Sequence, residues 1–282
     1  MGTLYLVRHG QASFGAEDYD QLSALGQRQS VRLGEYLGGK ALKFDAVLTG
    51  TLRRHAQTWA GIAEGMGLQA QIPNGAGTHG RSAGPPQARP APSGLSAAAP
   101  DVPAHIRTAR RATASGAGMS SAAHEVASVG AHIEWPGLNE YDSHAVIEAV
   151  HPQPLPKPDS PEGYRHHFRL LRDGLAQWMA GVVSPKGMPE YVDFVHGITS
   201  ALDHIRHSYT GNVLLVSSGG PIATAVGHIL GSPPEKTIEL NMRIRNSALT
   251  EFAFNPKRHM LLTYNTLPHL DHADYAGWVT YA

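Results

Sequence analysis

The strongest constraint on the fold is an alternation of strand and helix patterns in the first 67 residues. Residues 3–8, TLYLVR, are typical of a buried strand, and residues 22–39 carry apolar side chains at helical spacing and end on two glycines. A second buried strand pattern at 44–50 precedes a second helix pattern at 51–67. Because this order is typical of parallel strands joined by crossover helices, we predict an α/β fold. The expected form is a doubly wound, mostly parallel sheet flanked by helices in three α/β/α layers.

The second half of the chain continues with similar patterns. Helices are predicted at 161–183 and 188–209, the first with Ser160 as its N-cap and Pro161 at its first position. A buried strand, a Gly-rich turn and a helix follow over 212–231. Closing strands are predicted in the segments ALTEFAF (248–254), MLLTYN (260–265) and GWVTYA (277–282).

A change of composition interrupts the pattern between the two halves. Residues 73–133 are rich in Pro, Gly, Ala, Ser and Arg, and they hold too little large apolar surface to offset the entropy of ordering. We therefore expect one domain over 1–282 with a disordered insertion at 73–133, and order resuming at Glu134. An inert insertion, or an out-of-frame stretch of coding sequence, is favoured over a partner-binding tail, and a substrate-covering lid remains an alternative.

Composition excludes several classes of function. The 23 Lys and Arg residues balance 23 Asp and Glu residues, so we expect no nucleic-acid partner and no attraction to an anionic membrane. The chain has no cysteine, no secretion signal ahead of Thr3 and no apolar run near the ~20 residues of a membrane span, which favours a cytoplasmic protein. No P-loop, dinucleotide fingerprint or metal-binding histidine pattern occurs, so no cofactor and no metal are expected. The oligomeric state is not predicted.

Cationic side chains gather at the predicted strand ends. Arg8 and His9 end the first strand, SSGGP follows the strand at 213–216, and Arg53 and Arg54 begin the second helix. Ligands of doubly wound sheets collect beyond the carboxyl ends of the strands. Guanidinium groups and the amides of a helix N-terminus both suit phosphate oxygens. A neutral imidazole is nucleophilic at pH 7, so we predict that the arginines hold a phosphoryl group while His9 attacks it.

Six motifs in order resemble the landmarks of one family. They are LYLVRHGQAS, LSALGQRQ, VLTGTLRRHAQT, PGLNEYD, VLLVSSGG and NSALTEF. Together they resemble the histidine phosphatase superfamily, in its phosphoglycerate mutase-like branch. The resemblance runs from Thr3 to the end of the chain, except for the segment around 73–133.

The resemblance implies a role for each matching residue. His9 matches the nucleophile that becomes phosphohistidine, and Arg8 matches its phosphate-clamping neighbour. The family's RAxxT-like motif falls on residues 54–58, so Arg54 rather than Arg53 is the second clamp. Glu140 matches the general acid and base, against the alternative of a surface carboxylate. Gln11 and Ser13 occupy the loop where family members contact phosphate or substrate.

One family residue is missing. The strand VLLVS normally runs into a second histidine that holds the phosphoryl oxygens, and this chain has Ser218 there, followed by Gly219 and Gly220. A hydroxyl donates one hydrogen bond without a charge, and the amide of Gly219 remains as a further phosphate-binding group. The chain resembles a subgroup with Ser-Gly-Gly and an ending like YNTLPHLDH, in which His269 is a candidate second imidazole. A packed or surface histidine is the favoured interpretation of His269.

These observations predict a phosphate monoester hydrolase that acts on a phosphorylated small molecule. The reaction would pass through a phosphohistidine at His9 and need no metal. Two alternatives stay open. One is phosphoryl transfer like that of a phosphoglycerate mutase, and the other is a catalytically weak protein that binds a phosphorylated ligand or regulates a partner.

Overall fold

The computed structural model describes residues 1–13, 20–68, 129–156, 158 and 160–281. All of them belong to one compact unit made of Met1–Ala76 and Ala127–Ala282. The disorder predicted for 73–133 falls mainly on residues 73–128, which lie outside the described residues. The last three residues of the predicted insertion, 131–133, belong instead to the strand Ala131–Glu134. Regular structure therefore begins before Glu134, where the sequence predicted it to resume.

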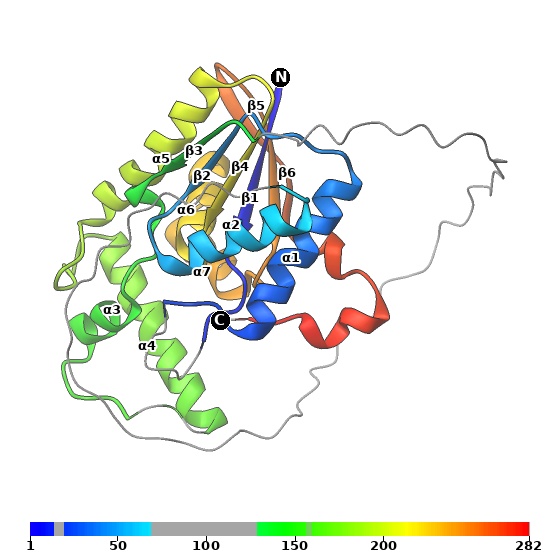
Figure 1. Cartoon of the computed structure of the whole chain (residues 1–282). Helices are drawn as coiled ribbons and strands as arrows, with labels where there is room; N and C mark the ends of the chain where they lie inside the picture. The colour runs from blue at the N-terminus through cyan, green and yellow to red at the C-terminus, as the bar shows by residue number, and fades with distance from the viewer. Residues whose placement is uncertain (14–19, 69–128, 157, 159, 282) are drawn as a thin grey trace, which may run out of the picture. The chain divides into compact units, whose positions relative to one another are not determined.

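The described elements alternate along the chain as Figure 1 shows. The strands are β1 (Gly2–Arg8), β2 (Ala46–Thr49), β3 (Ala131–Glu134), β4 (Asn212–Ser217), β5 (Leu249–Asn255) and β6 (Arg258–Thr266). The α-helices are α1 (Ala24–Gly39), α2 (Arg53–Gly65), α3 (Ser143–Val150), α4 (Pro161–Met179), α5 (Tyr191–Ser208), α6 (Gly219–Leu230) and α7 (Pro234–Arg243). Short 3-10 helices cover Pro136–Leu138, Pro268–Leu270 and Ala273–Trp278.

The strands form one six-stranded sheet in the order β3-β2-β4-β1-β5-β6. The first four run parallel, and β5 and β6 add an antiparallel edge. In the parallel pairing of β1 with β4, Arg8 lies opposite Ser217. The residues that follow these two strands, beginning with His9 and Ser218, therefore emerge side by side at one edge of the sheet.

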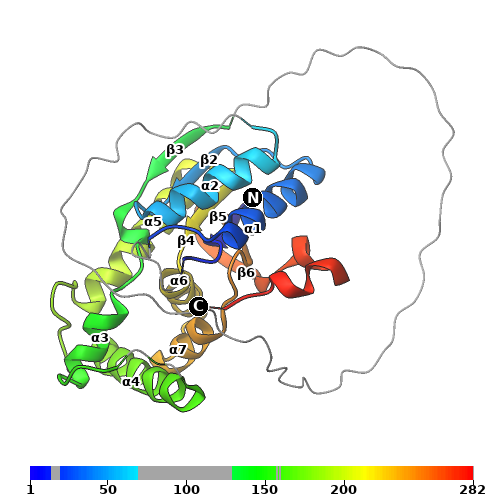
Figure 2. The same ribbon diagram turned by 60° about the horizontal axis from the view of Figure 1, so that its bottom comes forward.

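Two apolar cores hold helices on both faces of the sheet. Val7, Val47 and Val216 pack on one face against α1 and α2. Successive side chains of a strand point to opposite faces, so Leu6 and Leu48 lie on the other face of the sheet. Helices that include α4, α5 and α6 cover them there. Figure 2 shows α1 and α2 lying next to each other on their side of the sheet. The predicted α/β class with three layers is confirmed.

The C-terminal segment differs from the prediction. GWVTYA was expected to form a closing strand at 277–282, but residues 277–281 form none, and the 3-10 helix Ala273–Trp278 ends there. The segment packs on α1 instead, with the Arg28 guanidinium 5.0 Å from the Trp278 ring centre and that of Arg32 4.9 Å from the Tyr275 ring centre. Cation–π contacts on α1 thus take the place of pairing along β6.

Candidate active site

His9 follows directly after β1, and its backbone is fixed on two sides. Its N–H donates to the Ser217 carbonyl at 2.9 Å, and its own carbonyl accepts from the Ser247 N–H at 3.1 Å. The ring atom Nδ1 lies 2.7 Å from the Gly10 carbonyl oxygen. Because a carbonyl only accepts, Nδ1 carries the proton and Nε2 keeps its lone pair.

Burial keeps this imidazole neutral. The side chain of His9 is 4% exposed. Burial, followed by the charges of Arg8 and Arg54 and the nearby His55, lowers the pKa of His9 well below 6.5. The ring is thus a neutral base with a free lone pair on Nε2, which is the form that a nucleophile needs.

The loop after His9 lies tightly between α1 and α2. The Gly10 N–H donates to Thr58 Oγ1 at 3.1 Å, and the same hydroxyl donates to the Arg54 carbonyl at 2.7 Å. A Cβ atom on Gly10 would stand 2.4 Å from the Gly26 carbonyl oxygen, so only glycine allows this approach. The threonine of the RAxxT-like motif therefore holds the loop after His9 on α2.

Two buried guanidinium groups flank His9. Arg8 is 5% exposed and its Nη1 donates to the Ile244 carbonyl at 2.6 Å. Arg54 is 7% exposed and pairs through Nη1 with Asp20 Oδ1 at 2.8 Å. Arg53 is exposed, and its backbone N–H donates to the other oxygen of Asp20 at 2.9 Å. Asp20 was not among the predicted site residues; it both caps α2 and orients Arg54.

Glu140 lies on the N-terminus of α6. Its two oxygens accept from the Gly220 N–H at 3.1 Å and 3.2 Å. Burial raises the pKa of Glu140 above 4.5, and the Gly220 hydrogen bond with the charges of Arg8 and Arg54 opposes this rise. The same two guanidinium groups therefore act on His9 and on Glu140, so all four groups share one electrostatic environment. A carboxyl group with a raised pKa is suited to donate a proton.

Gly220 has no room for a side chain. A Cβ atom there would stand 2.2 Å from Glu140 Oε1 and 2.5 Å from the Tyr141 ring. We expect Gly220→Ala to displace the carboxyl group and lower kcat about 10²-fold, the cost of a misplacement of about 1 Å in an active site. Steady-state kinetics would measure this. Gly39→Ala is the control, because a Cβ there meets nothing within 4 Å. A folded Gly220→Ala variant with unchanged kcat would show that the close approach of Gly220 does not position Glu140.

Ser218 and Gly219 lie at the start of α6, next to Arg8 and His9 at the end of β1. Ser218 is the buried N-cap residue, and its Oγ lies 2.8 Å from His55 Nε2 rather than on a helix amide. A Cβ on Gly219 would lie 3.6 Å from Arg8 Nε, so the backbone of this glycine borders the guanidinium. His55 was not among the predicted site residues. Its ring centre lies 5.8 Å from that of His9.

Gln11 and Ser13 lie in the loop after His9, as expected, but their hydrogen bonds lead to the start of α1. Gln11 Oε1 accepts from Ser23 Oγ at 2.8 Å, and the Gln11 N–H donates to Gln29 Oε1 at 2.8 Å. The Ser13 N–H donates to the Gln21 carbonyl at 2.8 Å. Within the described residues these contacts support the loop.

His269 is buried and lies one residue away from the His9 backbone, with Ser247 between them. Its Nε2 lies 3.0 Å from Ser247 Oγ, and Ser247 donates its backbone N–H to the His9 carbonyl. Burial, with a smaller effect of Arg32, lowers the pKa of His269 to about 3. The structure thus places this imidazole in the packing that supports the His9 backbone. In the described chain it makes no hydrogen bond to Arg8 or Glu140.

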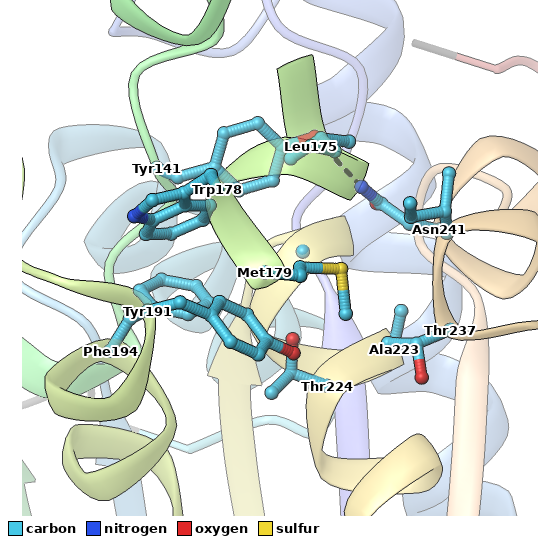
Figure 3. A pocket seen from close by; sticks show the side chains of 12 residues that line it. Tyr141, Leu175, Trp178, Met179, Tyr191, Phe194, Ala223, Thr224, Thr237 and Asn241 are labelled. Carbon is cyan, nitrogen blue, oxygen red and sulfur yellow. Dashed lines mark hydrogen bonds between the residues drawn. The ribbon is translucent and has the colours of Figure 1, made fainter. Parts of the chain in front are cut away.

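A small apolar pocket adjoins the site. Gly220 lines it, and so does Tyr141, whose hydroxyl accepts from Asn241 Nδ2 at 2.8 Å. Figure 3 shows the rings of Tyr141, Trp178 and Tyr191 around this space, which α4, α5, α6 and α7 enclose. An aromatic wall therefore stands next to the carboxyl group of Glu140.

No group of three or more His, Asp or Glu side chains among the described residues is arranged to hold a metal ion. Every helix among them is too short or too polar to cross a bilayer.

The chain belongs to the histidine phosphatase superfamily (branch 1), whose model matches residues 4–75 and 162–267. No curated protein matches the sequence significantly. Solved structures with a similar fold include mycobacterial glucosyl-3-phosphoglycerate phosphatase in complex with VO3, at 20% identity and a TM-score of 0.52 over 94% of this chain and 100% of that one.

Two further structures match over most of their length. One is an Entamoeba histolytica phosphoserine phosphatase mutant in complex with phosphoserine, at 16% identity and a TM-score of 0.51 over 96% of this chain and 100% of that one. The other is the α-ribazole phosphatase of Shigella flexneri, at 14% identity and a TM-score of 0.50 over 94% of this chain and 96% of that one. At these identities the likeness establishes the fold.

Proposed function

We propose that the protein is a phosphate monoester hydrolase that works through a phosphohistidine at His9. The observation that carries this proposal is the state of His9, a buried neutral imidazole with its Nδ1 proton on the Gly10 carbonyl and its Nε2 lone pair free. Arg8 and Arg54 supply two buried positive charges beside it. Family membership supports the same chemistry.

The first step transfers the phosphoryl group to the enzyme. Arg8 and Arg54 hold the phosphoryl oxygens, with Ser218 and the amide of Gly219 as further donors. The Nε2 lone pair of His9 forms a bond to phosphorus while the bond from phosphorus to the leaving oxygen breaks. Glu140, whose pKa is raised by burial, gives its proton to that oxygen.

The second step releases phosphate. A water molecule attacks the phosphorus of phosphohistidine, and the Glu140 carboxylate, now ionised, takes the proton of the water. The bond from His9 Nε2 to phosphorus breaks, and the ring returns to its neutral form. The Gly220 N–H keeps Glu140 in place through both steps.

The substrate that we propose is a phosphorylated small molecule. Structures of the same fold contain phosphoserine in one case and VO3 in another, which supports a site for a phosphoryl group. The aromatic wall beside Glu140 would border the leaving group. We propose neither metal nor cofactor for this reaction, since the chain itself supplies nucleophile, acid and cations.

Hydrolysis of p-nitrophenyl phosphate by the whole chain in EDTA tests the proposal. We expect metal-independent turnover with one inorganic phosphate released per nitrophenol. Phosphate appearing on an added phosphoglycerate acceptor would instead support a mutase-like transferase. Vanadate binding without any turnover would favour the alternative of a protein that binds a phosphorylated ligand.

The pKa shifts predict the pH dependence of kcat/KM. His9 is active when neutral, so its lowered pKa places the acid limb below pH 6.5. Glu140 is active when protonated in the first step, so its raised pKa places the alkaline limb above pH 4.5. Rates would be corrected for the second ionisation of the substrate phosphate, near pH ~6. An acid limb at or above pH 6.5 would contradict the environment described for His9.

A further inference from the structure

A buried glutamine on α1 contacts the loop that follows His9. Gln29 is 0% exposed, and its Oε1 accepts from the Gln11 N–H at 2.8 Å. Its Nε2 donates to the Trp278 carbonyl at 2.6 Å and to Thr280 Oγ1 at 3.0 Å. The side chain therefore joins the His9 loop to the C-terminal segment, which is drawn in red alongside α1 (Figure 1). Gln29 takes no part in the two steps proposed above.

The orientation of the Gln29 amide follows from its partners. A backbone N–H only donates a hydrogen bond, and a backbone carbonyl only accepts one. Turning the amide over would bring its NH2 group against the Gln11 N–H and its oxygen against the Trp278 carbonyl. Buried polar groups left without a partner in this way are costly. The oxygen of Gln29 is therefore fixed toward the His9 loop.

The two peptide groups that follow His9 are held in different ways. The first has outside partners at both ends, because its carbonyl accepts from the Ser247 N–H at 3.1 Å and its N–H donates to Thr58 Oγ1 at 3.1 Å. The second joins residues 10 and 11. Its carbonyl lies 2.7 Å from His9 Nδ1, and its N–H donates to Gln29. Among the described residues, Gln29 is thus the hydrogen-bond partner that holds the second group from outside the loop.

This second peptide group transmits the contact with Gln29 to the imidazole. A peptide group is planar, so its N–H and its carbonyl turn together. The carbonyl accepts the Nδ1 proton of His9, which sets the tautomer and the angle of the ring and leaves the Nε2 lone pair for the phosphoryl group. A chain of hydrogen bonds therefore runs from the Trp278 carbonyl through Gln29 and the peptide group to His9. Hydrogen bonds arranged in such a chain strengthen one another.

We propose that Gln29 is a positioning residue that orients the His9 imidazole through the Gly10–Gln11 peptide group. Its effect on the rate rests on the proposed phosphohistidine function. The C-terminal residues Trp278 and Thr280 act one step further away, because they hold the amide of Gln29.

Replacing Gln29 with leucine tests the proposal directly. Leucine has a similar volume but leaves the Gln11 N–H without its acceptor, so the peptide group and the imidazole are free to turn. We expect kcat to fall about tenfold to 10²-fold, the cost of a misplaced catalytic group. KM should change little, because Arg8 and Arg54 still hold the phosphoryl group. Gln27→Leu, the same change at an exposed position of α1, is the control with unchanged kcat.

Nitrogen-15 NMR of the imidazole locates the His9 proton and does not depend on turnover. We expect wild type to carry that proton on Nδ1, and Gln29→Leu to show a larger share of the ring protonated at Nε2. Leu33→Val removes volume from the buried face of the same helix. It should lower the unfolding temperature without this change in the spectrum, so it controls for a general loosening of α1. A His9 spectrum in Gln29→Leu equal to that of wild type would overturn the inference.

The C-terminal segment offers a milder test. Thr280→Val removes the hydroxyl that accepts from Gln29 Nε2 and, at 2.9 Å, from Asn246 Nδ2. We expect a smaller loss of kcat than in Gln29→Leu, with a shift of the His9 spectrum in the same direction. Most of this loss should vanish once residue 29 is leucine, because the two residues act through one amide. Thr280→Ser keeps the hydroxyl and should restore the wild-type rate and spectrum.

The outcomes separate this inference from the proposed function. Wild-type turnover that is absent, or indifferent to His9→Ala, would overturn the phosphohistidine mechanism, while the spectra would still decide whether Gln29 orients the ring. Normal wild-type turnover with unchanged kcat in a folded Gln29→Leu variant would overturn only the role of Gln29. If thermal unfolding shows that Gln29→Leu is not folded, the two Thr280 variants decide. Equal rates and equal His9 spectra in Thr280→Val and Thr280→Ser would then overturn the inference.

Discussion

Replacing His9 with alanine is expected to lower kcat about 10⁴-fold or more, as when the nucleophile of a covalent enzyme is removed. The side chain supplies the only lone pair that the proposed first step uses, and Arg8 and Arg54 cannot replace it because guanidinium groups stay protonated. Acid quenching of wild type during turnover should trap an acid-labile phosphoenzyme. The His9→Ala variant should form none. Steady-state rates and phosphate bound to protein are the two measurements.

The same variant should keep its fold and its phosphate site. His9 is buried, so alanine leaves a cavity, and we expect a modest fall in the unfolding temperature. Binding of vanadate should weaken without disappearing, because both arginines remain. His228→Ala, which removes an exposed imidazole from α6, is the control with unchanged kcat. A His9→Ala variant that turns over at the wild-type rate would exclude the phosphohistidine mechanism.

Much of the fold could be predicted because its elements carry local patterns. The strands at β1, β2 and β4 are apolar runs that end in polar or glycine residues, and the helices around them repeat apolar residues at helical spacing. Strand β3 was missed because it is short and follows the compositionally biased segment. The ending GWVTYA has the alternation of a strand, but contacts of its tryptophan with α1 decide its structure. Long-range packing of that kind leaves no local pattern.

In the candidate site, too, residues within sequence motifs could be predicted, and residues brought in by long-range packing could not. Arg8, His9, Arg54 and Glu140 stand in motifs, so their types and neighbours made them candidates from the sequence alone. Asp20 is a single acidic residue with no motif, and only the folded chain brings it to Arg54. The sequence did hold one sign of His55 in the RAxxT-like motif, where it takes the place of alanine. Its contact with Ser218 joins two distant parts of the chain, so no local pattern reveals it.

Replacing Glu140 with glutamine is expected to lower kcat about 10² to 10⁴-fold, the usual contribution of a general acid and base. Glutamine keeps the size of the side chain and can still accept from the Gly220 N–H, so the loss reports proton transfer. Glu148→Gln, an exposed change on α3, is the matched control with unchanged kcat. The alkaline limb of the pH profile should also disappear, because no carboxyl group remains to ionise.

Comparing two substrates separates the acid role of Glu140 from its base role. An alkyl phosphate leaves as a poor alkoxide unless protonated, so its kcat/KM should fall far more in Glu140→Gln than that of p-nitrophenyl phosphate, whose phenolate leaves readily. With the aryl substrate the phosphoenzyme should then accumulate, since water attack has lost its base. A burst of nitrophenol equal to the enzyme concentration would be the sign. Equal losses with both substrates would mean that Glu140 donates no proton to the leaving group.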